Sequence, residues 1–247
     1  MTDGTMNLND TVFGKSCTGK RNNNEDALLA EKAGDGYLIA IADGIGGHRA
    51  GEVASGIAVT TLSEEFSNRY LEGMSLDEIG SLLSDSFRVA HITIETEAKD
   101  DKDGMGTTLV AAFIRNKSVV IANTGDSRAY HIRDRVLFRT KDHSVVQSLV
   151  DSQQISEDDA KHHPLRAMIT NSLGSSFLVD IYHRTLQPGD LVLLSSDGFH
   201  DYVDEEVITV ADKKGPLSEL VSELVNEALR TSRDNVTVVI YRAPVEK

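Results

Sequence analysis

Hydrophobic and polar positions change along the chain in blocks that predict buried strands followed by amphipathic helices. The run GYLIAIAD, residues 36–43, is apolar at nearly every position and is short enough for a strand buried on both faces. Two stretches with helical spacing follow, at 50–70 and 75–100, and the second opens with Ser75 and Glu78 in the arrangement of a capping box. We therefore expect a central strand that leads into two helices.

The middle of the chain has the pattern of short antiparallel strands. Turn-forming groups at 115–117, 125–126 and 133–135 divide residues 106–140 into β-rich runs, which is typical of a meander. Residues 142–174 are polar and helix-biased and interrupt this pattern. They predict an excursion from the core.

The C-terminal part predicts two more strands around one helix. DLVLLSSDGF, residues 190–199, is a buried strand that ends in Asp-Gly, residues 217–229 form an amphipathic helix, and NVTVVIYRA, residues 235–243, forms a last strand. Because strands and helices fall into separate blocks, the predicted fold class is α+β, with antiparallel sheets covered by helices. Only four prolines and no Ser/Gly-rich linker occur, so residues 1–247 are expected to form one domain.

Composition narrows the partners and the compartment. The net charge of -14 argues against nucleic acid and anionic membranes as main partners, because both are polyanions. The N-terminus lacks the apolar core of a signal peptide, and no apolar run has the length of about 20 residues that a membrane helix needs. Cys17 is the single cysteine and has no adjacent histidine, so we expect a bystander thiol in a cytoplasmic protein.

The stretch LIAIADGIGGHRAGEVAS, residues 38–55, poses the main chemical question. A dinucleotide fingerprint needs a third glycine where Arg49 stands, and a phosphate-binding P-loop needs a lysine where Glu52 follows Gly51. Asp43 directly before the glycines would repel a bound phosphate unless a cation lay between them. The stretch therefore favours a metal site over a nucleotide site.

Further acidic residues stand at the tips of predicted strands. Asp43, Asp126, Asp197 and Asp234 each flank one, and Glu25-Asp26 forms another acidic pair. Hard divalent cations need several oxygen ligands. Each acid alone also fits a turn or a strand start. Their joint pattern, without a Ser-His-Asp or Cys-His arrangement in a recognisable context, indicates a metal centre.

Seven stretches in order carry a resemblance to a known family: RNNNEDA, ADGIGGHRAGEVAS, GTTLVAAF, ANTGDSRAY, KDHS with HPLRAMITNSLG, LLSSDGFHD and RDNVTVVI. From about Lys15 to Tyr241 the chain resembles the metal-dependent Ser/Thr protein phosphatases of type 2C, the PPM family, in their compact bacterial form. The resemblance implies a four-layer α-β-β-α sandwich of two antiparallel sheets flanked by helices, with a metal centre at one edge of the sheets.

The resemblance also implies a ligand set for two Mn²⁺ or Mg²⁺ ions. Asp43 would bridge both ions, Asp197 and Asp234 would complete one, and Glu25 with the Gly44 carbonyl would serve the other. The expected activity is hydrolysis of phosphoserine and phosphothreonine in proteins by a metal-activated water, without a phosphoenzyme intermediate.

Three further residues receive roles from the same resemblance. Asp126 with Asp197 would hold a third, weaker metal ion, Asp26 would hydrogen-bond metal-bound water, and Arg21 would grip the substrate phosphate. The expected partners are Ser/Thr-phosphorylated proteins, the substrates of a cognate Ser/Thr kinase, and the chain is expected to be a monomer.

The chain departs from parts of the family pattern. Eukaryotic members carry a histidine where Ile45 stands, so the general acid is not assigned; we expect His48 to order the turn and metal-bound water to supply the proton. The excursion at 142–174 corresponds to the family's flap, where Ala167 and Asn171 replace the usual Asn and Arg.

Two adjacent histidines in the flap, His162 and His163, are expected to have a surface role rather than to bind zinc, because adjacent side chains point in different directions on most backbones. The alternative function is a catalytically silent scaffold of the same fold that binds phosphoproteins. A third possibility keeps the serine phosphatase chemistry and directs it at phosphorylated anti-sigma antagonists.

Overall fold

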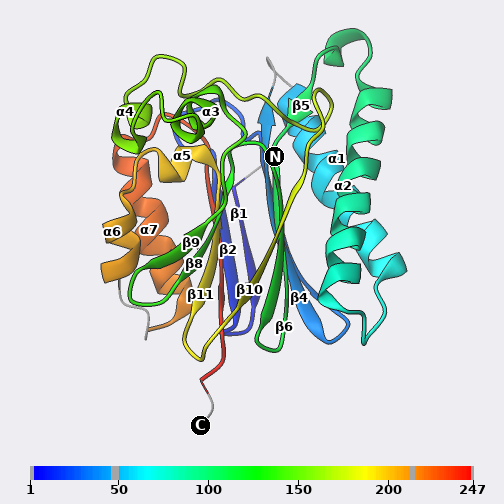
Figure 1. Ribbon diagram of the computed structural model, residues 1–247, viewed down its shortest axis with the longest axis vertical. Helices are drawn as coiled ribbons and strands as arrows, with labels where there is room; N and C mark the ends of the chain where they lie inside the picture. The colour runs from blue at the N-terminus through cyan, green and yellow to red at the C-terminus, as the bar shows by residue number, and fades with distance from the viewer. Residues whose placement is uncertain (1–2, 46–49, 212–214, 246–247) are drawn as a thin grey trace.

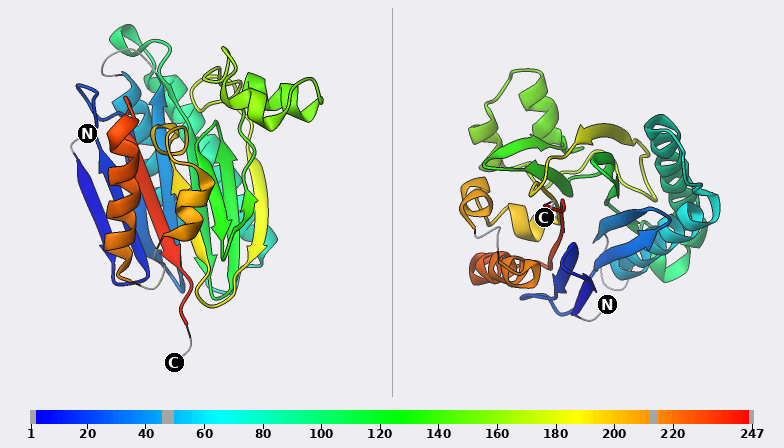
Figure 2. Two further views of the ribbon diagram at one scale, coloured as in Figure 1. Left: turned by 90° about the vertical axis from the view of Figure 1, so that its left-hand side faces the viewer. Right: turned by 90° about the horizontal axis from the view of Figure 1, so that it is seen from below.

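Two antiparallel six-stranded sheets lie face to face, with helices on both outer sides (Figure 1). The computed structural model describes residues 3–45, 50–211 and 215–245. Seen along the strands, the order of layers is helix, sheet, sheet, helix (Figure 2, right). The predicted α+β class and its four-layer arrangement are confirmed.

The first sheet joins the two ends of the chain. Its order places the C-terminal strand between strands from the N-terminal hairpin and the middle of the chain: β1 (Gly4–Leu8), β2 (Val12–Cys17), β12 (Val236–Arg242), β11 (Leu191–Ser195), β8 (Arg128–Ile132) and β9 (Val136–Arg139).

The second sheet is built from the middle of the chain. Its path is β10 (Asp180–Thr185), β7 (Ser118–Thr124), β6 (Leu109–Arg115), β4 (Gly36–Ile45) and β3 (Asp26–Ala33), and the short β5 (Gly106–Thr107) pairs with the end of β4. In the β3–β4 ladder Asp26 stands opposite Asp43, which brings two of the predicted site residues side by side.

Helices cover each sheet on its outer side. The second sheet is covered by α1 (Ala50–Arg69) and α2 (Leu76–Glu97), and the 3-10 turn Asp100–Lys102 follows α2. The first sheet is covered by α5 (Asp197–His200), α6 (Glu205–Val210) and α7 (Leu217–Thr231). The excursion carries α3 (Val145–Asp151) and α4 (Glu157–Lys161), which project beyond the sheets (Figure 2, left).

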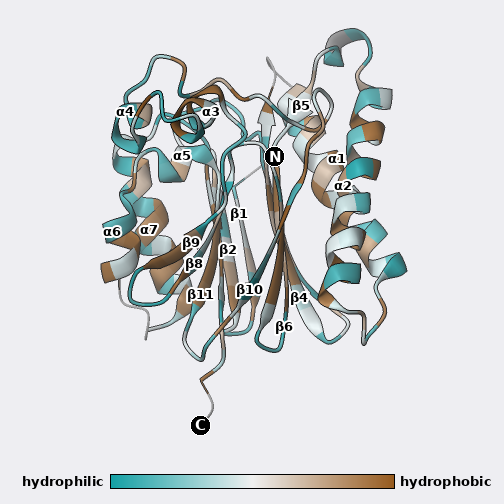
Figure 3. Cartoon of the chain, in the orientation of Figure 1, coloured by the Kyte–Doolittle hydropathy of each residue, from teal (hydrophilic) through white to brown (hydrophobic). Residues whose placement is uncertain are grey.

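Three apolar cores hold the layers together. One lies between α1, α2 and the second sheet, one between α7 and the first sheet, and the third between the two sheets. Figure 3 accordingly shows brown stretches on the central strands, whereas the helices carry many teal residues. Strands buried on both faces explain why residues 36–43 have no polar alternation.

Local signals in the sequence locate several elements correctly. The Ser75 hydroxyl accepts a hydrogen bond from the Glu78 N–H at 3.3 Å, and the Glu78 carboxylate accepts one from the Ser75 N–H at 2.8 Å, so the predicted capping box begins α2. The N-terminal hairpin in the structure was not predicted from the sequence. β1 pairs with β2 as an exposed edge strand, and its polar composition carries no strand pattern. Among the described residues, no helix combines the length and apolar character that crossing a membrane requires.

Candidate metal centre and active site

The predicted site residues meet in one pocket at the end of the sheets where β4 and β11 finish. The pocket has a volume of about 220 Å³ and is lined by Arg21, Glu25, Asp43, Gly44, Ile45, Asp126, Ile169, Asp197, Asp234 and Asn235. It therefore contains every residue that the sequence suggested as a metal ligand.

Asp43 is held by backbone contacts to the neighbouring β5 segment. Its N–H donates to the Thr108 hydroxyl at 2.9 Å, and its carbonyl accepts from the Thr107 hydroxyl at 2.8 Å and from the Thr108 N–H at 2.9 Å. Both threonines are buried. With its main chain fixed on both sides, Asp43 has its carboxylate directed at the pocket by the strand itself.

Gly44 is required by close approach of two chain segments. A Cβ at this position would lie 2.3 Å from the Gly51 carbonyl oxygen and 2.7 Å from the Glu25 carbonyl oxygen. The Gly44 N–H donates to that same Glu25 carbonyl at 3.2 Å. Only a glycine lets the start of α1 and the Glu25 segment both pack against β4 here.

Asn235 positions Glu25 and was not singled out from the sequence. Its side-chain oxygen accepts from the Glu25 N–H at 2.9 Å, and its amide donates to the carbonyls of Thr18 and Asn23, each at 2.9 Å. This one side chain ties the loop that carries Glu25 to the start of β12. The signal in the sequence is its place directly after Asp234, but its partners are more than two hundred residues away.

Asp26 lies next to Asp43 in the ladder but is not among the pocket-lining residues. Its carboxylate accepts hydrogen bonds from the Ser196 hydroxyl at 2.9 Å and from the Thr237 hydroxyl at 2.6 Å, and its side chain is buried. The sequence did not indicate these two hydroxyl partners. Asp26 thus supports the pocket from behind and joins both sheets.

The remaining acids come from the first sheet and from a turn. Asp197 is the first residue of α5 and is separated from the end of β11 by Ser196, and Asp234 precedes β12. Asp126 follows β7 at Gly125, whose φ of +99° suits glycine. A Cβ on Gly198 would lie 1.9 Å from the Asn235 carbonyl oxygen, so the Asp-Gly pair lets α5 pack directly against the start of β12.

Burial and mutual repulsion raise the pKa values of these carboxyl groups. Burial, followed by the charges of Asp26 and Asp197, raises the pKa of Asp43 well above its ordinary value. Burial and Asp197 do the same for Asp126. The pKa of Asp26 is raised to about 7, chiefly by burial, and that of Asp197 to about 6 by burial and then by Asp234. So many acids in one place favour a bound cation.

The donor set fits hard divalent cations. Within the described residues no three acidic, histidine or cysteine side chains close around one point. The carboxylates line a pocket instead, and this spacing suits ions such as Mg²⁺ that keep several water ligands. Oxygen donors without nitrogen or sulfur also fit Mg²⁺ and Mn²⁺ better than softer metals. The fit follows from the burial and mutual repulsion of these acids alone, without comparison to another protein.

Arg21 supplies the positive charge at the rim of the pocket. Its guanidinium donates to the Asp234 carboxylate at 2.7 Å, and its side chain is 54% exposed. The hydrogen bond with Asp234 raises the pKa of Arg21. An anion bound in the pocket would therefore also lie near the Arg21 guanidinium.

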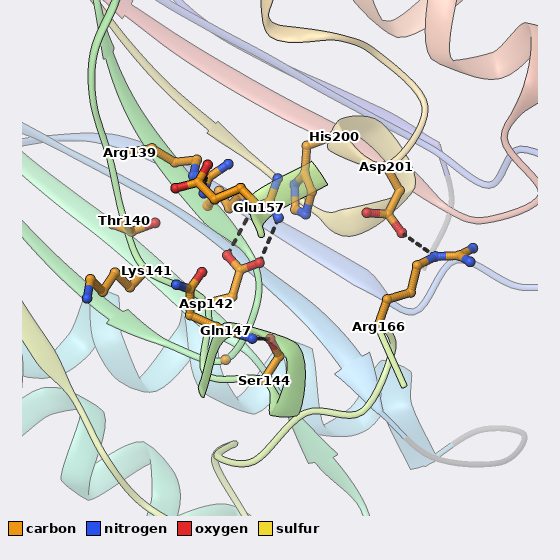
Figure 4. A network of polar contacts seen from close by, with 12 residues as sticks. Arg139, Thr140, Lys141, Asp142, Ser144, Gln147, Glu157, Arg166, His200 and Asp201 are labelled. Carbon is orange, nitrogen blue, oxygen red and sulfur yellow. Dashed lines mark hydrogen bonds and ion pairs between the residues drawn. The ribbon is translucent and has the colours of Figure 1, made fainter. Parts of the chain in front are cut away.

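Ion pairs and backbone bonds fasten the excursion to the core. Arg128 and Asp142 form a two-bond pair at 2.9 and 2.7 Å, and Arg166 lies 3.8 Å from Asp201 (Figure 4). The ring Nδ1 of the buried His143 accepts a hydrogen bond from the Gly125 N–H at 3.3 Å, and the backbone N–H of His143 donates to the Gly125 carbonyl at 2.9 Å. The sequence stretch KDHS therefore braces the turn that carries Asp126.

Other residues considered in the sequence lie apart from the pocket or outside the described residues. His48, with Gly46, Gly47 and Arg49, lies outside the described residues. His162 is exposed at the end of α4, and the His163 ring accepts a hydrogen bond from the Leu165 N–H at 3.2 Å, as expected for surface histidines. Cys17 is buried, and burial raises the pKa of its thiol, which suits a bystander.

Comparison with known proteins gives consistent matches. The family model described as Protein phosphatase 2C matches residues 13–234. The serine/threonine phosphatase stp of Listeria monocytogenes is 36% identical over 228 residues, which cover 89% of this chain and 90% of that protein. The crystal structure of serine/threonine phosphatase Stp1 from Staphylococcus aureus superimposes with a TM-score of 0.88 at 35% identity, covering 100% of this chain and 98% of that one.

A third match bears on the metal. The catalytic domain of the serine/threonine protein phosphatase PstP, whose structure is in complex with 2 manganese ions, superimposes with a TM-score of 0.77 at 33% identity. The match covers 94% of this chain and 96% of that one.

Proposed function

This chain belongs to the protein phosphatase 2C family and is a serine/threonine protein phosphatase, and we propose that it hydrolyses phosphoserine and phosphothreonine in proteins directly with water, without a phosphoenzyme intermediate. Divalent ions, when bound, supply a hydroxide nucleophile near neutral pH and neutralise charge on the phosphoryl group. The convergence of five acidic side chains and Arg21 on one pocket carries the proposal.

The chain's own groups divide the work of holding two Mn²⁺ or Mg²⁺ ions. We assign Asp43 to both ions, Asp197 and Asp234 to one, and Glu25 with the Gly44 carbonyl to the other. The backbone bonds to Asp43 and the Asn235 amide at Glu25 support this assignment, because fixed ligands lose little entropy on binding.

Asp126 and Asp197 are assigned to a third, weaker ion. Both line the pocket, and burial raises the pKa of both carboxyl groups, with their mutual repulsion adding to the pKa of Asp126. The hydrogen bond between His143 and Gly125 supports the turn that carries Asp126.

Arg21 is assigned to the substrate phosphate. Its planar guanidinium can donate to two phosphoryl oxygens at once, and its half-exposed side chain lies at the pocket rim. Asp26, the ladder partner of Asp43, is assigned to hydrogen-bonding the water that a bound metal ion would hold. Ile45 has no proton to give, so we infer that the leaving serine or threonine oxygen takes its proton from water.

We further propose that residues 1–247 act as one domain and as a cytoplasmic monomer on substrates of a Ser/Thr kinase. The single buried cysteine suits a reducing compartment, and the three cores that join all layers suit one cooperative unit. Sedimentation of the purified protein tests the monomer, and a single unfolding transition by two probes tests the single unit.

The decisive experiment compares a phosphothreonine peptide and an aryl phosphate as substrates. Turnover is expected with Mn²⁺ or Mg²⁺ and should stop with EDTA. Asp43→Ala and Asp197→Ala should lose nearly all of it, whereas Asp77→Asn, a change at a side chain that is 98% exposed, should not. Metal binding measured by calorimetry without turnover of either substrate would instead support the silent scaffold.

A further inference from the structure

A second groove opens beside the carboxylate pocket, between residues 164–175 and the glycines before and at the start of β5, Gly104 and Gly106. It has a volume of about 530 Å³, and we call it the flap groove. Ile45 and Ile169 line both the flap groove and the carboxylate pocket. The flap groove and the carboxylate pocket therefore adjoin at these two side chains.

The flap groove differs in chemistry from its surroundings. Among the described residues that line it, none carries a charge, although 26% of the residues of the chain are charged. Leu165 and Met168 present large apolar side chains that are 39% and 51% exposed. Covering them with another apolar group is favourable, because apolar surface leaves water. Methionine also adapts its shape to different ligands.

The wall of the flap groove is held in place by backbone bonds to the start of the excursion, where His143 is itself bonded to Gly125. The Val145 N–H donates to the Met168 carbonyl at 2.9 Å, and the Thr170 N–H donates to the His143 carbonyl at 2.8 Å. Arg166, between the two apolar residues, faces Asp201 at 3.8 Å (Figure 4). A wall that is already ordered costs less entropy when a ligand binds.

The other side of the carboxylate pocket is polar. A larger groove of about 890 Å³ there is lined by Val53 and otherwise by charged and amide side chains, among them Arg21, Glu25 and Glu52, and it shares Arg21, Glu25 and Asn235 with the pocket. A polypeptide whose phosphate sits in the pocket thus meets charged groups on one side and uncharged, partly apolar groups on the other. The two flanks of a substrate are not equivalent in this protein.

We propose that the flap groove binds an apolar side chain that lies within three positions of the phosphorylated residue in the substrate. This inference rests on the proposed function, because the phosphate anchors the peptide in the carboxylate pocket. Three extended residues span about 10 Å, so only side chains close to the phosphorylated residue are considered for a groove that adjoins the pocket. An acidic side chain at that position would meet no cation in the groove and would lie beside the carboxylates.

The test is a set of phosphothreonine peptides that carry leucine, alanine or aspartate in turn at each of the three positions on either side of the phosphothreonine. We expect leucine to exceed alanine in kcat/KM by about 10-fold at one flanking position, as for a leucine side chain about half removed from water. Aspartate should be poorer than alanine at that position. A flat profile at every position would overturn the proposal.

Variants connect the preference to the groove. Leu165→Ala and Met168→Ala should each reduce the leucine-to-alanine ratio to about 3-fold or less. Leu71→Ala, at an apolar side chain that is 68% exposed in the turn between α1 and α2, should keep the parent ratio. The ratio is measured within one variant, so it does not depend on the fraction of active protein.

Three outcomes are separable. An unchanged ratio in Met168→Ala, together with a sedimentation change showing loss of a dimer, would assign the groove to a second copy of this chain and overturn the proposal. Absence of turnover of both aryl phosphate and peptides with Mn²⁺ would remove the proposed function, and the groove proposal with it. Turnover of aryl phosphate with no flanking preference would remove the groove proposal alone.

Discussion

The carboxylate pocket leads to a prediction that sets stability against function: Asp197→Asn should stabilise the metal-free protein at neutral pH while it removes activity. The pKa of Asp197 is raised from 3.8 to about 6, first by burial and then by the charges of Asp234 and Asp201. At neutral pH the folded protein therefore carries an ionised group in an unfavourable place. Asparagine has nearly the same shape and no charge to lose.

The sign and size of the effect follow from proton linkage. A carboxyl group whose pKa is raised in the folded state keeps its proton when the unfolded chain has lost it. The free energy of unfolding therefore falls as pH rises from about 4 to about 6, and above that the loss is complete. A difference of this size in pKa corresponds to about 3 kcal/mol. Rearrangement around the new amide would reduce this gain.

The assay is urea unfolding after treatment with a chelator, at about pH 7.5 and about pH 4.5. At the higher pH Asp197→Asn should be more stable than the parent by up to about 3 kcal/mol, and the gap should shrink at the lower pH. Asp77→Asn, on an exposed aspartate, should show no such gap. Saturating Mn²⁺ should stabilise the parent by about 3 kcal/mol or more and the variant by much less.

Two results would refute this reasoning. A variant less stable than the parent at about pH 7.5 would mean that Asp197 is stabilising as it stands. A gap equal at both pH values would mean that the effect comes from packing rather than from charge.

Three more changes test other parts of the structure. Burial raises the pKa of Asp190, but hydrogen bonds led by Arg133 overcome this effect and lower the pKa to about 2. The ionised carboxylate therefore stabilises the fold above about pH 4, and this stabilisation is lost as pH falls toward 2. Asp190→Asn should cost about 2 kcal/mol in urea unfolding at neutral pH, and an unchanged midpoint would contradict this. Gly198→Ala places a Cβ 1.9 Å from the Asn235 carbonyl oxygen and should lower Mn²⁺ affinity in calorimetry at least tenfold; unchanged affinity would show that α5 moves freely. Ser75→Ala should cost about 1 kcal/mol of unfolding free energy without changing kcat, and a kcat loss would contradict a purely local cap.

Apart from the partly buried β9, the strands that the sequence predicted are largely buried on both faces. Residues 36–43 and 191–195 are nearly continuous apolar runs because each lies between another sheet and a helical layer. β1 escaped prediction because an exposed edge strand needs no apolar face. The order of strands could not be predicted either, since β12 enters between β2 and β11 through packing of residues far apart in the chain.

The same distinction applies to the site. The acids themselves were predictable, because an acid at the end of a buried strand is conspicuous. The roles of their supports were not: Asn235, Thr108 and His143 lie in stretches that carry the family resemblance, but the local sequence does not show which main-chain groups they bond. The flap groove could not be predicted from the sequence either, since it forms only where Leu165 and Met168 lie near the distant residue Ile45. The local pattern of apolar residues shows which segments are buried, whereas the hydrogen-bonding partners of a side chain depend on how distant segments are brought together.

The two ends of β11 explain why the pocket has its chemistry. Asp190, just before the strand, is fully buried but receives hydrogen bonds from Arg133 and His131, and its pKa is about 2. Asp197, just after the strand, is surrounded by other carboxylates, and its pKa is about 6. The protein's own cationic side chain thus balances the charge of the aspartate before β11, whereas among the described residues none does so for the aspartate after β11. Because the fold can pair a buried aspartate with its own cations, the acids at the pocket end are best explained as retained for an external cation, at a cost in stability that the bound ion offsets.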